Sequence, residues 1–223
     1  MTDHNGHRSR LRERFLKGGE KASPDYEIVE LLLFGAIPRG DVKPLAKTLL
    51  KECGSLSGLL QADPQKLKLI PGVGDATIAT LKAVHEASCR LVREEACQNP
   101  IFDTWNTVIK YCRARMSHLT VEQFRLLFLD QKNKIIADEL QQQGTVNSTP
   151  IFPREVVKRT LELGASSLIM VHNHPSGDPT PSKADIEITK RVIKAAKELD
   201  IHVLDHIIIG KSGHTSLRDK QLI

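Results

Sequence analysis

The hydrophobic pattern of this chain changes its period near residue 100, and this change limits the fold more than any other feature. Up to residue 98 the apolar residues recur at helical spacing, and no stretch before residue 120 alternates as a strand does. After residue 120, short apolar runs of strand length alternate with helical segments. The period breaks around Cys97-Gln98-Asn99-Pro100. We therefore expect an all-helical domain over residues 1–98 and an α/β layered domain over residues 101–223.

Proline, glycine and capping residues divide the helical part into segments. Ser23-Pro24-Asp25 and Asp63-Pro64 are typical helix starts, and Gly54 is placed as a helix stop. After the sequence PGVG, an amphipathic pattern predicts a long helix from about Asp75 to Glu94.

The second part predicts five strands and three helices. A helix is expected over residues 104–117, another from Pro153 to a stop at Gly164, and a long one after residue 182. The expected strands cover residues 124–130, 134–140, 167–174, 201–210 and 214–217. Helices alternating with apolar strands are typical of an α/β layered domain.

Charge and cysteine content limit the classes of function. The chain has 32 Lys and Arg against 27 Asp and Glu, a net charge of +5, which is compatible with a polyanionic partner but does not require one. No apolar run approaches the roughly 20 residues of a membrane helix, and the N-terminus lacks the apolar core of a signal peptide. We therefore expect a cytoplasmic protein without membrane contact. The four cysteines form no CxxC pair, which disfavours a cysteine zinc site and suits free thiols: Cys53, Cys89, Cys97 and Cys112.

The strongest chemical signal is His172-x-His174, followed after a Pro/Gly-rich turn by Ser182-x-x-Asp185. Residues two apart on a strand point the same way, so both imidazoles leave the strand end on one side. The turn returns the chain to a helix start, where the Asp185 carboxylate can face them. Two imidazoles and one carboxylate, with a fourth position open for water, are the ligand set of a catalytic zinc site. The same set leaves iron or manganese open.

Two simpler interpretations compete with the metal site. Ser182 and Asp185 also form a capping-box pattern, which alone would explain both residues. Two histidines could stand near a strand end by chance. The Pro/Gly turn that joins the two halves of the pattern favours the metal site.

This pattern resembles the JAMM/MPN+ metalloprotease motif, and the sequence around it resembles the RadC family. The segments NGHRSRLRERFL and PDYEIVELLLFGAIPRGDVKPLAKTLL are also similar to the amino-terminal half of that family. The resemblance implies a helical helix-hairpin-helix domain followed by a JAB/MPN α/β/α sandwich of the cytidine-deaminase-like class. It implies one zinc ion per chain, held by His172, His174 and Asp185, and a metallopeptidase type of hydrolysis.

The same resemblance implies a glutamate that is not a ligand and that moves protons during hydrolysis. Glu122, just before an expected strand, matches its position, and Glu155 is the alternative. The resemblance also gives Ser182 the role of stabilising a tetrahedral intermediate. Asn173 departs from the deubiquitinase pattern, which has Ser or Thr between the histidines, and this bears on the substrate class. Asp205-His206 is open to two interpretations, a partner of a ligand histidine or a buried pair.

Gly72-Val73-Gly74, flanked by Leu67 and Ile70 and followed by a helix, resembles a helix-hairpin-helix element. Its glycines allow a tight turn close to a phosphate, and the next helix start offers N–H groups to it. DNA is therefore the expected partner. Asp75-Ala76-Thr77 stands where a basic residue is usual, and a hairpin used only for packing remains the alternative. The basic stretch at Arg8, Arg10, Arg12 and Arg14 reads as a solvated arm or a DNA contact.

Together these features predict a RadC-like, zinc-dependent hydrolase, of metallopeptidase type, that acts at DNA. A nuclease using the same site is the first alternative, because a zinc-activated water can also attack phosphorus. A non-catalytic DNA- or protein-binding scaffold is the second. The protein substrate and the oligomeric state are left open.

Overall fold

The computed structural model describes residues 4–18, 23–101, 103–144 and 151–223. The chain divides into two compact units, Met1–Ser88 and Cys89–Ile223. The division falls inside one long helix, α6 (Asp75–Gln98), which reaches the sequence position where the domain boundary is expected. None of the helices in the described ranges has both the length and the apolar character of a membrane span.

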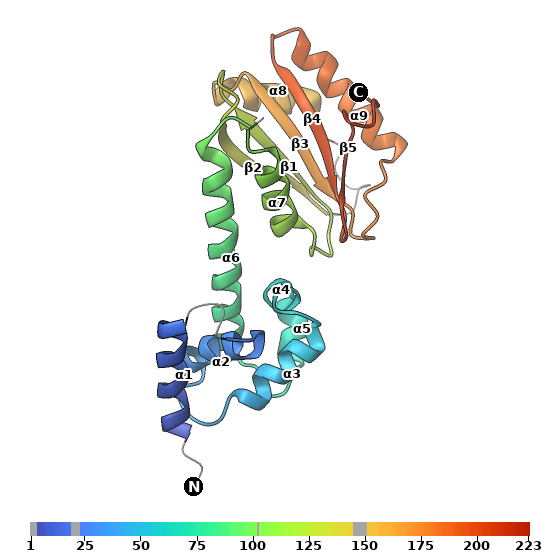
Figure 1. Ribbon diagram of the computed structural model, residues 1–223. Coiled ribbons are helices and arrows are strands. Elements are labelled where there is room, and N and C mark those ends of the chain that lie inside the picture. The colour runs from blue at the N-terminus through green and yellow to red at the C-terminus, as the bar shows by residue number, and fades with distance from the viewer. Residues whose placement is uncertain (1–3, 19–22, 102, 145–150) are drawn as a thin grey trace. The chain divides into compact units, whose positions relative to one another are not determined.

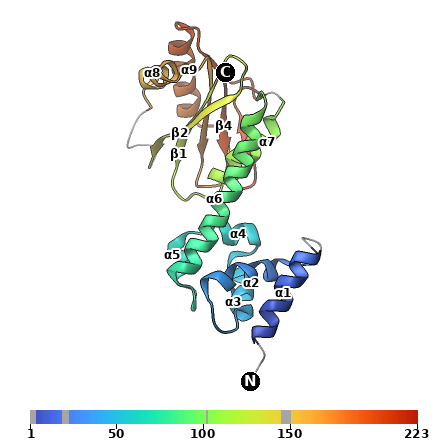
Figure 2. The same ribbon diagram turned by 90° about the vertical axis from the view of Figure 1, so that its left-hand side faces the viewer.

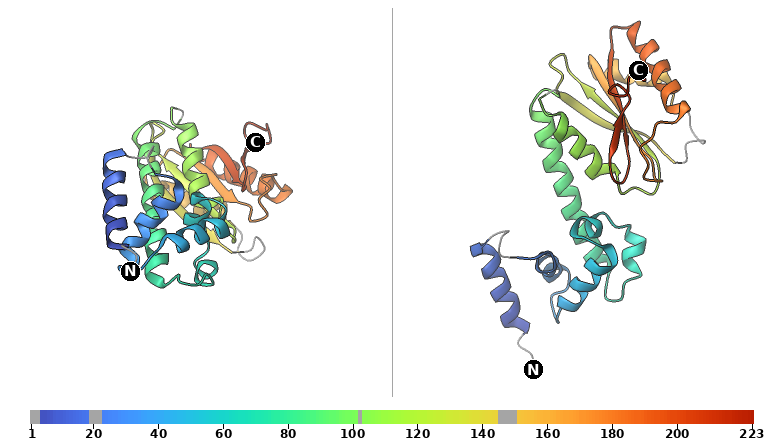
Figure 3. Two further views of the ribbon diagram at one scale, coloured as in Figure 1. Left: turned by 60° about the horizontal axis from the view of Figure 1, so that its bottom comes forward. Right: turned by 45° about the vertical axis from the view of Figure 1, so that its right-hand side comes forward.

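Helices are the only regular secondary structure among the described residues of the first unit (Figure 1). Its core forms where the apolar stripes of the helices meet, and it contains Leu33, Leu49, Leu59, Leu67 and Leu81. The helices before α6 are α1 (His4–Gly18), α2 (Asp25–Ala36), α3 (Lys43–Cys53), α4 (Leu56–Gln61) and α5 (Pro64–Lys68). In the right-hand view of Figure 3 the two shortest helices, α4 and α5, lie beside the start of α6. Leu59 of α4 and Leu67 of α5 belong to the same core as Leu81 of α6.

Gly54 and Asp63 mark helix ends in this unit where the sequence predicts them, and Ser55 caps α4 in addition. Ser55 and Asp63 accept hydrogen bonds from the first turns of α4 and α5, and Gly54 takes a left-handed conformation after α3. The buried Arg8 donates to three backbone carbonyls between α2 and α3, those of Ile37, Pro38 and Gly40. Arg8 is thus a structural residue of the folded unit, and the interpretation of this position as part of a solvated arm is wrong.

The second unit contains a five-stranded sheet in the order β2-β1-β3-β4-β5. Its strands are β1 (Gln123–Leu129), β2 (Ile135–Gln143), β3 (Ser167–Asn173), β4 (His202–Ile209) and β5 (His214–Ser216). Only β3 and β4 are parallel, because α9 (Lys183–Lys197) crosses over between them. All seven residues of β3 are buried, as its continuous apolar run predicts.

Helices cover both faces of the sheet, so this unit has three layers (Figures 1 and 2). One face packs against α7 (Trp105–Met116) and the end of α6, through residues such as Leu127, Ile169 and Ile207. The other packs against α8 (Pro153–Glu162) and α9, through Phe128 and Met170. The expected helical region followed by a mixed α/β domain is therefore confirmed.

Candidate metal centre

The chain turns sharply where β3 ends, and this turn carries the second histidine of the motif. His172 lies in the last part of β3 and is 1% exposed, and His174 is two residues further along. The backbone N–H of His174 donates to the carbonyl of Ile209 at 2.9 Å, which ties the turn to the end of β4. Gly177 supports the following loop with a φ of 95° and accepts from the N–H of Lys211.

The third side chain arrives from the start of α9, and here the capping box is complete. Ser182 Oγ accepts from the N–H of Asp185 at 3.2 Å, and Asp185 Oδ2 accepts from the N–H of Ser182 at 2.7 Å. Capping leaves the other carboxylate oxygen, Oδ1, to face His172. Helix capping and the metal-site geometry are therefore both present and do not exclude each other.

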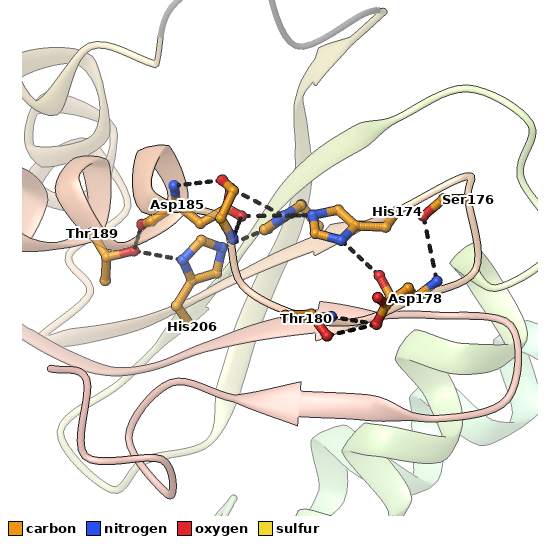
Figure 4. A network of polar contacts seen from close by, with 9 residues as sticks. His174, Ser176, Asp178, Thr180, Asp185, Thr189 and His206 are labelled. Atoms are coloured by element: carbon orange, nitrogen blue, oxygen red, sulfur yellow. Dashed lines mark hydrogen bonds and ion pairs between the residues drawn. The ribbon is translucent and has the colours of Figure 1, made fainter.

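The three side chains of the motif converge. His172 Nε2 lies 2.9 Å from His174 Nε2 and 3.3 Å from Asp185 Oδ1, and His174 Nε2 lies 3.6 Å from Asp185 Oδ2. Zn–N bonds of roughly 2.0–2.1 Å in a tetrahedron separate ligand atoms by about 3.3 Å. His172, His174 and Asp185 are also the one group of metal-ligating side chains found among the described residues. Figure 4 shows His174 and Asp185 facing each other from the loop and from α9.

A chain of hydrogen bonds fixes the tautomer of His172. The Thr189 hydroxyl donates to the carbonyl of Asp185, so Thr189 Oγ accepts from His206 Nδ1, 2.6 Å away. A neutral His206 then accepts at Nε2 from His172 Nδ1, 2.7 Å away. The remaining nitrogen of His172, Nε2, therefore carries a lone pair.

His174 presents the same nitrogen by a different route. Its Nδ1 donates to the carbonyl of Asp178 at 2.8 Å, so the lone pair is again on Nε2 (Figure 4). Two bare nitrogens and a carboxylate facing one another need a cation or a proton among them. The donor set thus fits a divalent cation with nitrogen and oxygen ligands.

The pKa directions agree with this arrangement. Burial lowers the pKa of His172 to about 4, against the opposing charge of Asp185. The hydrogen bond to Asp185 raises the pKa of His174. Burial alone would raise the pKa of Asp185, but the hydrogen bond with His174 and the charge of His172 hold it well below its usual range. Burial keeps the pKa of His206 well below its ordinary value, which supports its neutral form.

Glu122 stands directly before β1 and lines a cavity of about 260 Å³ together with His172 and Asp185. Burial raises the pKa of its carboxyl, with Asp185 adding to the increase and His174 opposing it. The cavity wall is partly apolar, through Phe124 and Ile188. By contrast Glu155, the alternative proton carrier, is exposed at the start of α8 and pairs with Arg154 at 3.2 Å.

The pair Asp205-His206 divides into two roles. His206 is the partner of a motif histidine, as one of the two interpretations expected. Asp205 is occupied elsewhere, because its carboxylate accepts from Ser216 Oγ and from the N–H groups of His206 and Arg218. Sequence reasoning did not find Thr189, whose spacing of four residues from Asp185 on α9 was the available signal.

Family models match both parts of the chain. Residues 102–222 match the RadC-like JAB domain, and residues 4–79 match the UPF0758 N-terminal domain. The chain belongs to the RadC-like JAB family. The resemblance drawn from the sequence is therefore confirmed, and the RadC-like JAB domain contains the whole His172, His174 and Asp185 cluster. This cluster and the domain together indicate a possible metallohydrolase.

Proposed function

We propose that this RadC-like protein is a zinc-dependent hydrolase of the JAMM/MPN+ type that cleaves peptide bonds. The observation that carries the proposal is the convergence of two bare Nε2 atoms and one carboxylate beside a half-buried glutamate. His172, His174 and Asp185 would hold the zinc ion. A zinc ion held there would supply a Lewis acid that polarises a carbonyl and lowers the pKa of a water.

The residues around that position have the properties that hydrolysis requires. Glu122, whose pKa is raised by burial, takes the proton of the attacking water and passes it to the leaving amine. The Ser182 hydroxyl accepts one hydrogen bond as the cap of α9 and keeps its own proton to donate to the oxyanion. Phe124 and Ile188 line the side of the cavity on which an apolar substrate group would rest.

The test uses zinc-loaded protein and a peptide digest of casein, with new termini detected by mass spectrometry. We expect cleavage by the parent, and a loss of about 10²–10⁴-fold in Glu122→Gln with its zinc content unchanged. Glu155→Gln is the matched control and should cleave like the parent. No new termini from the zinc-loaded parent would overturn the proposal, and a Glu155→Gln defect in place of a Glu122→Gln defect would reassign the base.

We further propose that the helical unit binds the DNA backbone through the hairpin before α6. Gly72 has a φ of 87°, Pro71 and Gly74 are exposed, and the N–H of Val73 closes the turn onto Ile70. Lys66 and Lys68 are exposed on α5 beside the hairpin and would contact a phosphate, and Lys68 also pairs with Asp75 at 3.2 Å.

A duplex oligonucleotide tests this second proposal and the nuclease alternative together. Lys66→Ala/Lys68→Ala should weaken binding at every sequence and reduce the salt dependence by about one per lysine. Equal binding by the parent and this variant would remove the hairpin from the interface. DNA cleavage that Glu122→Gln abolishes, with casein peptides left intact, would favour a nuclease.

A cytoplasmic setting completes the proposal. No disulfide joins the four cysteines among the described residues, Cys53, Cys89, Cys97 and Cys112, which suits a reducing compartment.

A further inference from the structure

Asn173 separates the two motif histidines, but its side chain is directed away from them. It is the last residue of β3 and is 1% exposed. Successive side chains alternate between the faces of a strand, so Asn173 leaves β3 on the side opposite to His172. A side chain so deeply buried is not placed to contact a substrate. The presence of Asn173 in place of the Ser or Thr of the deubiquitinase pattern therefore affects the protein's own structure and makes no substrate contact.

The side-chain amide of Asn173 binds the backbone on both sides of Glu122. Its Oδ1 accepts from the N–H of Gln123 at 2.8 Å, and its Nδ2 donates to the carbonyl of Val121 at 3.2 Å. The carbonyl of Glu122 itself accepts from the N–H of Gly144 at 3.0 Å. Three hydrogen bonds thus hold the short segment that carries the Glu122 carboxylate.

The need for this amide follows from the course of β3. The pairing of β1 with β3 ends at Phe124 and His172, because the chain after β3 turns to bond with β4 through His174. On the β3 side, the segment before β1 therefore has no strand beside it to bond with, while on its other side it bonds to the end of β2. A primary amide has one carbonyl and N–H donors, as a peptide group has, and so extends the ladder by one step.

We propose that Asn173 is a positioning residue that holds Glu122 over the metal centre. This inference rests on the proposed function, in which Glu122 moves the proton. The three residues at this strand end then have different roles. His172 and His174 face the cation, and Asn173 between them holds the general base Glu122. Only a side chain that both donates and accepts at this length can do so.

Two variants remove parts of the amide without a large change in shape. Asn173→Leu removes the donor and the acceptor. Asn173→Asp keeps an acceptor for Gln123 but loses the donor and places a carboxylate against the carbonyl of Val121. Asn133→Asp is the matched control, because Asn133 lies in the turn at the far end of the β1–β2 hairpin.

The experiment compares zinc-loaded parent and variants with the casein peptides, and it measures amide exchange of Gln123 by NMR. For both Asn173 variants we expect a kcat about 10–100-fold lower, KM within about twofold and an unchanged zinc content. The Gln123 amide should exchange at least about tenfold faster in Asn173→Leu, because it has lost its acceptor. Asn133→Asp should match the parent in all four measurements.

The outcomes separate this inference from the proposed function. A parent that cleaves no peptide means that the proposed function fails, and the inference falls with it. A cleaving parent with an unchanged kcat in both Asn173 variants overturns the inference alone. Loss of zinc in place of a lower kcat would also overturn it, because Asn173 would then act on the ligands. If Asn173→Leu does not fold, the near-isosteric Asn173→Asp decides through its kcat and zinc content.

Discussion

Two turns in this protein have the same local design and different surroundings. The hairpin before α6 and the loop before α9 each contain a glycine with positive φ, Gly72 and Gly177, and each leads to an aspartate in the first helical turn. Asp75 is exposed and pairs with the exposed Lys68. Asp185 is buried and faces two imidazoles. A carboxylate at a helix start is favourable in both places, but only the one that faces the histidines at the end of β3 forms a candidate metal site.

The largest difference between the two turns is expected when each carboxylate is removed in turn. Asp185→Asn keeps an acceptor for the N–H of Ser182, so the cap survives while the charged ligand is lost. We expect zinc affinity to fall by more than the roughly 10–100-fold that a partner behind the ligands is worth. Elemental analysis after dialysis measures it, with Asp75→Asn as the matched control. Equal zinc in both variants would contradict the assignment of Asp185 as a ligand.

A smaller effect is expected from the hydrogen-bond chain behind His172, which has no counterpart at the hairpin. Thr189→Val removes the hydroxyl that accepts from His206, so His206 no longer has a fixed tautomer. Zinc affinity should fall by about 10–100-fold. The control is Thr160→Val, because Thr160 is also fully buried and bonds back to the carbonyl four residues earlier, without a histidine. Equal zinc affinities in the two variants would show that the chain does not orient His172.

The pH dependence of zinc binding should distinguish the two histidines of the motif. The pKa of His174 is raised, so its proton persists to higher pH than on an ordinary histidine, and zinc must displace it. The pKa of His172 is about 4, so His172 is already neutral and adds no slope above that pH. Affinity should therefore drop by about tenfold per unit as the pH falls below the pKa of His174. Competition with a chelator between about pH 5 and 8 measures this affinity. The release of two protons for each zinc ion bound in that range would contradict the prediction.

The smallest difference concerns the two glycines. Either change to alanine forces a left-handed conformation that costs roughly 1–2 kcal/mol. At Gly72 the new Cβ would meet Leu45 at an ordinary 3.7 Å, so only stability should change. At Gly177 it would lie 2.9 Å from Lys211 Cδ, in the loop whose Asp178 carbonyl holds His174. Melting temperatures should fall for both, and zinc affinity should weaken only for Gly177→Ala.

Much of the fold could be predicted because its signals are local. Helix caps such as Asp63 and Ser182 are recognised within four residues of sequence, and the period of the apolar pattern separates helices from strands. The spacing from His172 to Asp185 is likewise a property of one short segment. The family resemblance then supplied Glu122, whose place beside the cavity agrees with its proposed role.

The contacts behind the site could not be predicted, because they depend on strand register. Asn173 reaches Gln123 only because β1 and β3 pair with Phe124 opposite His172. His206 reaches His172 only because β4 lies parallel to β3, with a register shift between Leu168 and Ile169. A shift of one residue would turn these side chains to the other face of the sheet.

The capping box at the start of α9 also limits the denticity of Asp185. Because Oδ2 accepts the Ser182 amide proton, the cap leaves Oδ1 as the carboxylate oxygen that faces His172 without a cap hydrogen bond. Calcium requires six to eight oxygen ligands and is poorly served by a site with two imidazoles and a monodentate carboxylate. The first turn of a helix thus disfavours large alkaline-earth ions, and the donor set of two imidazoles and one carboxylate suits borderline transition metals.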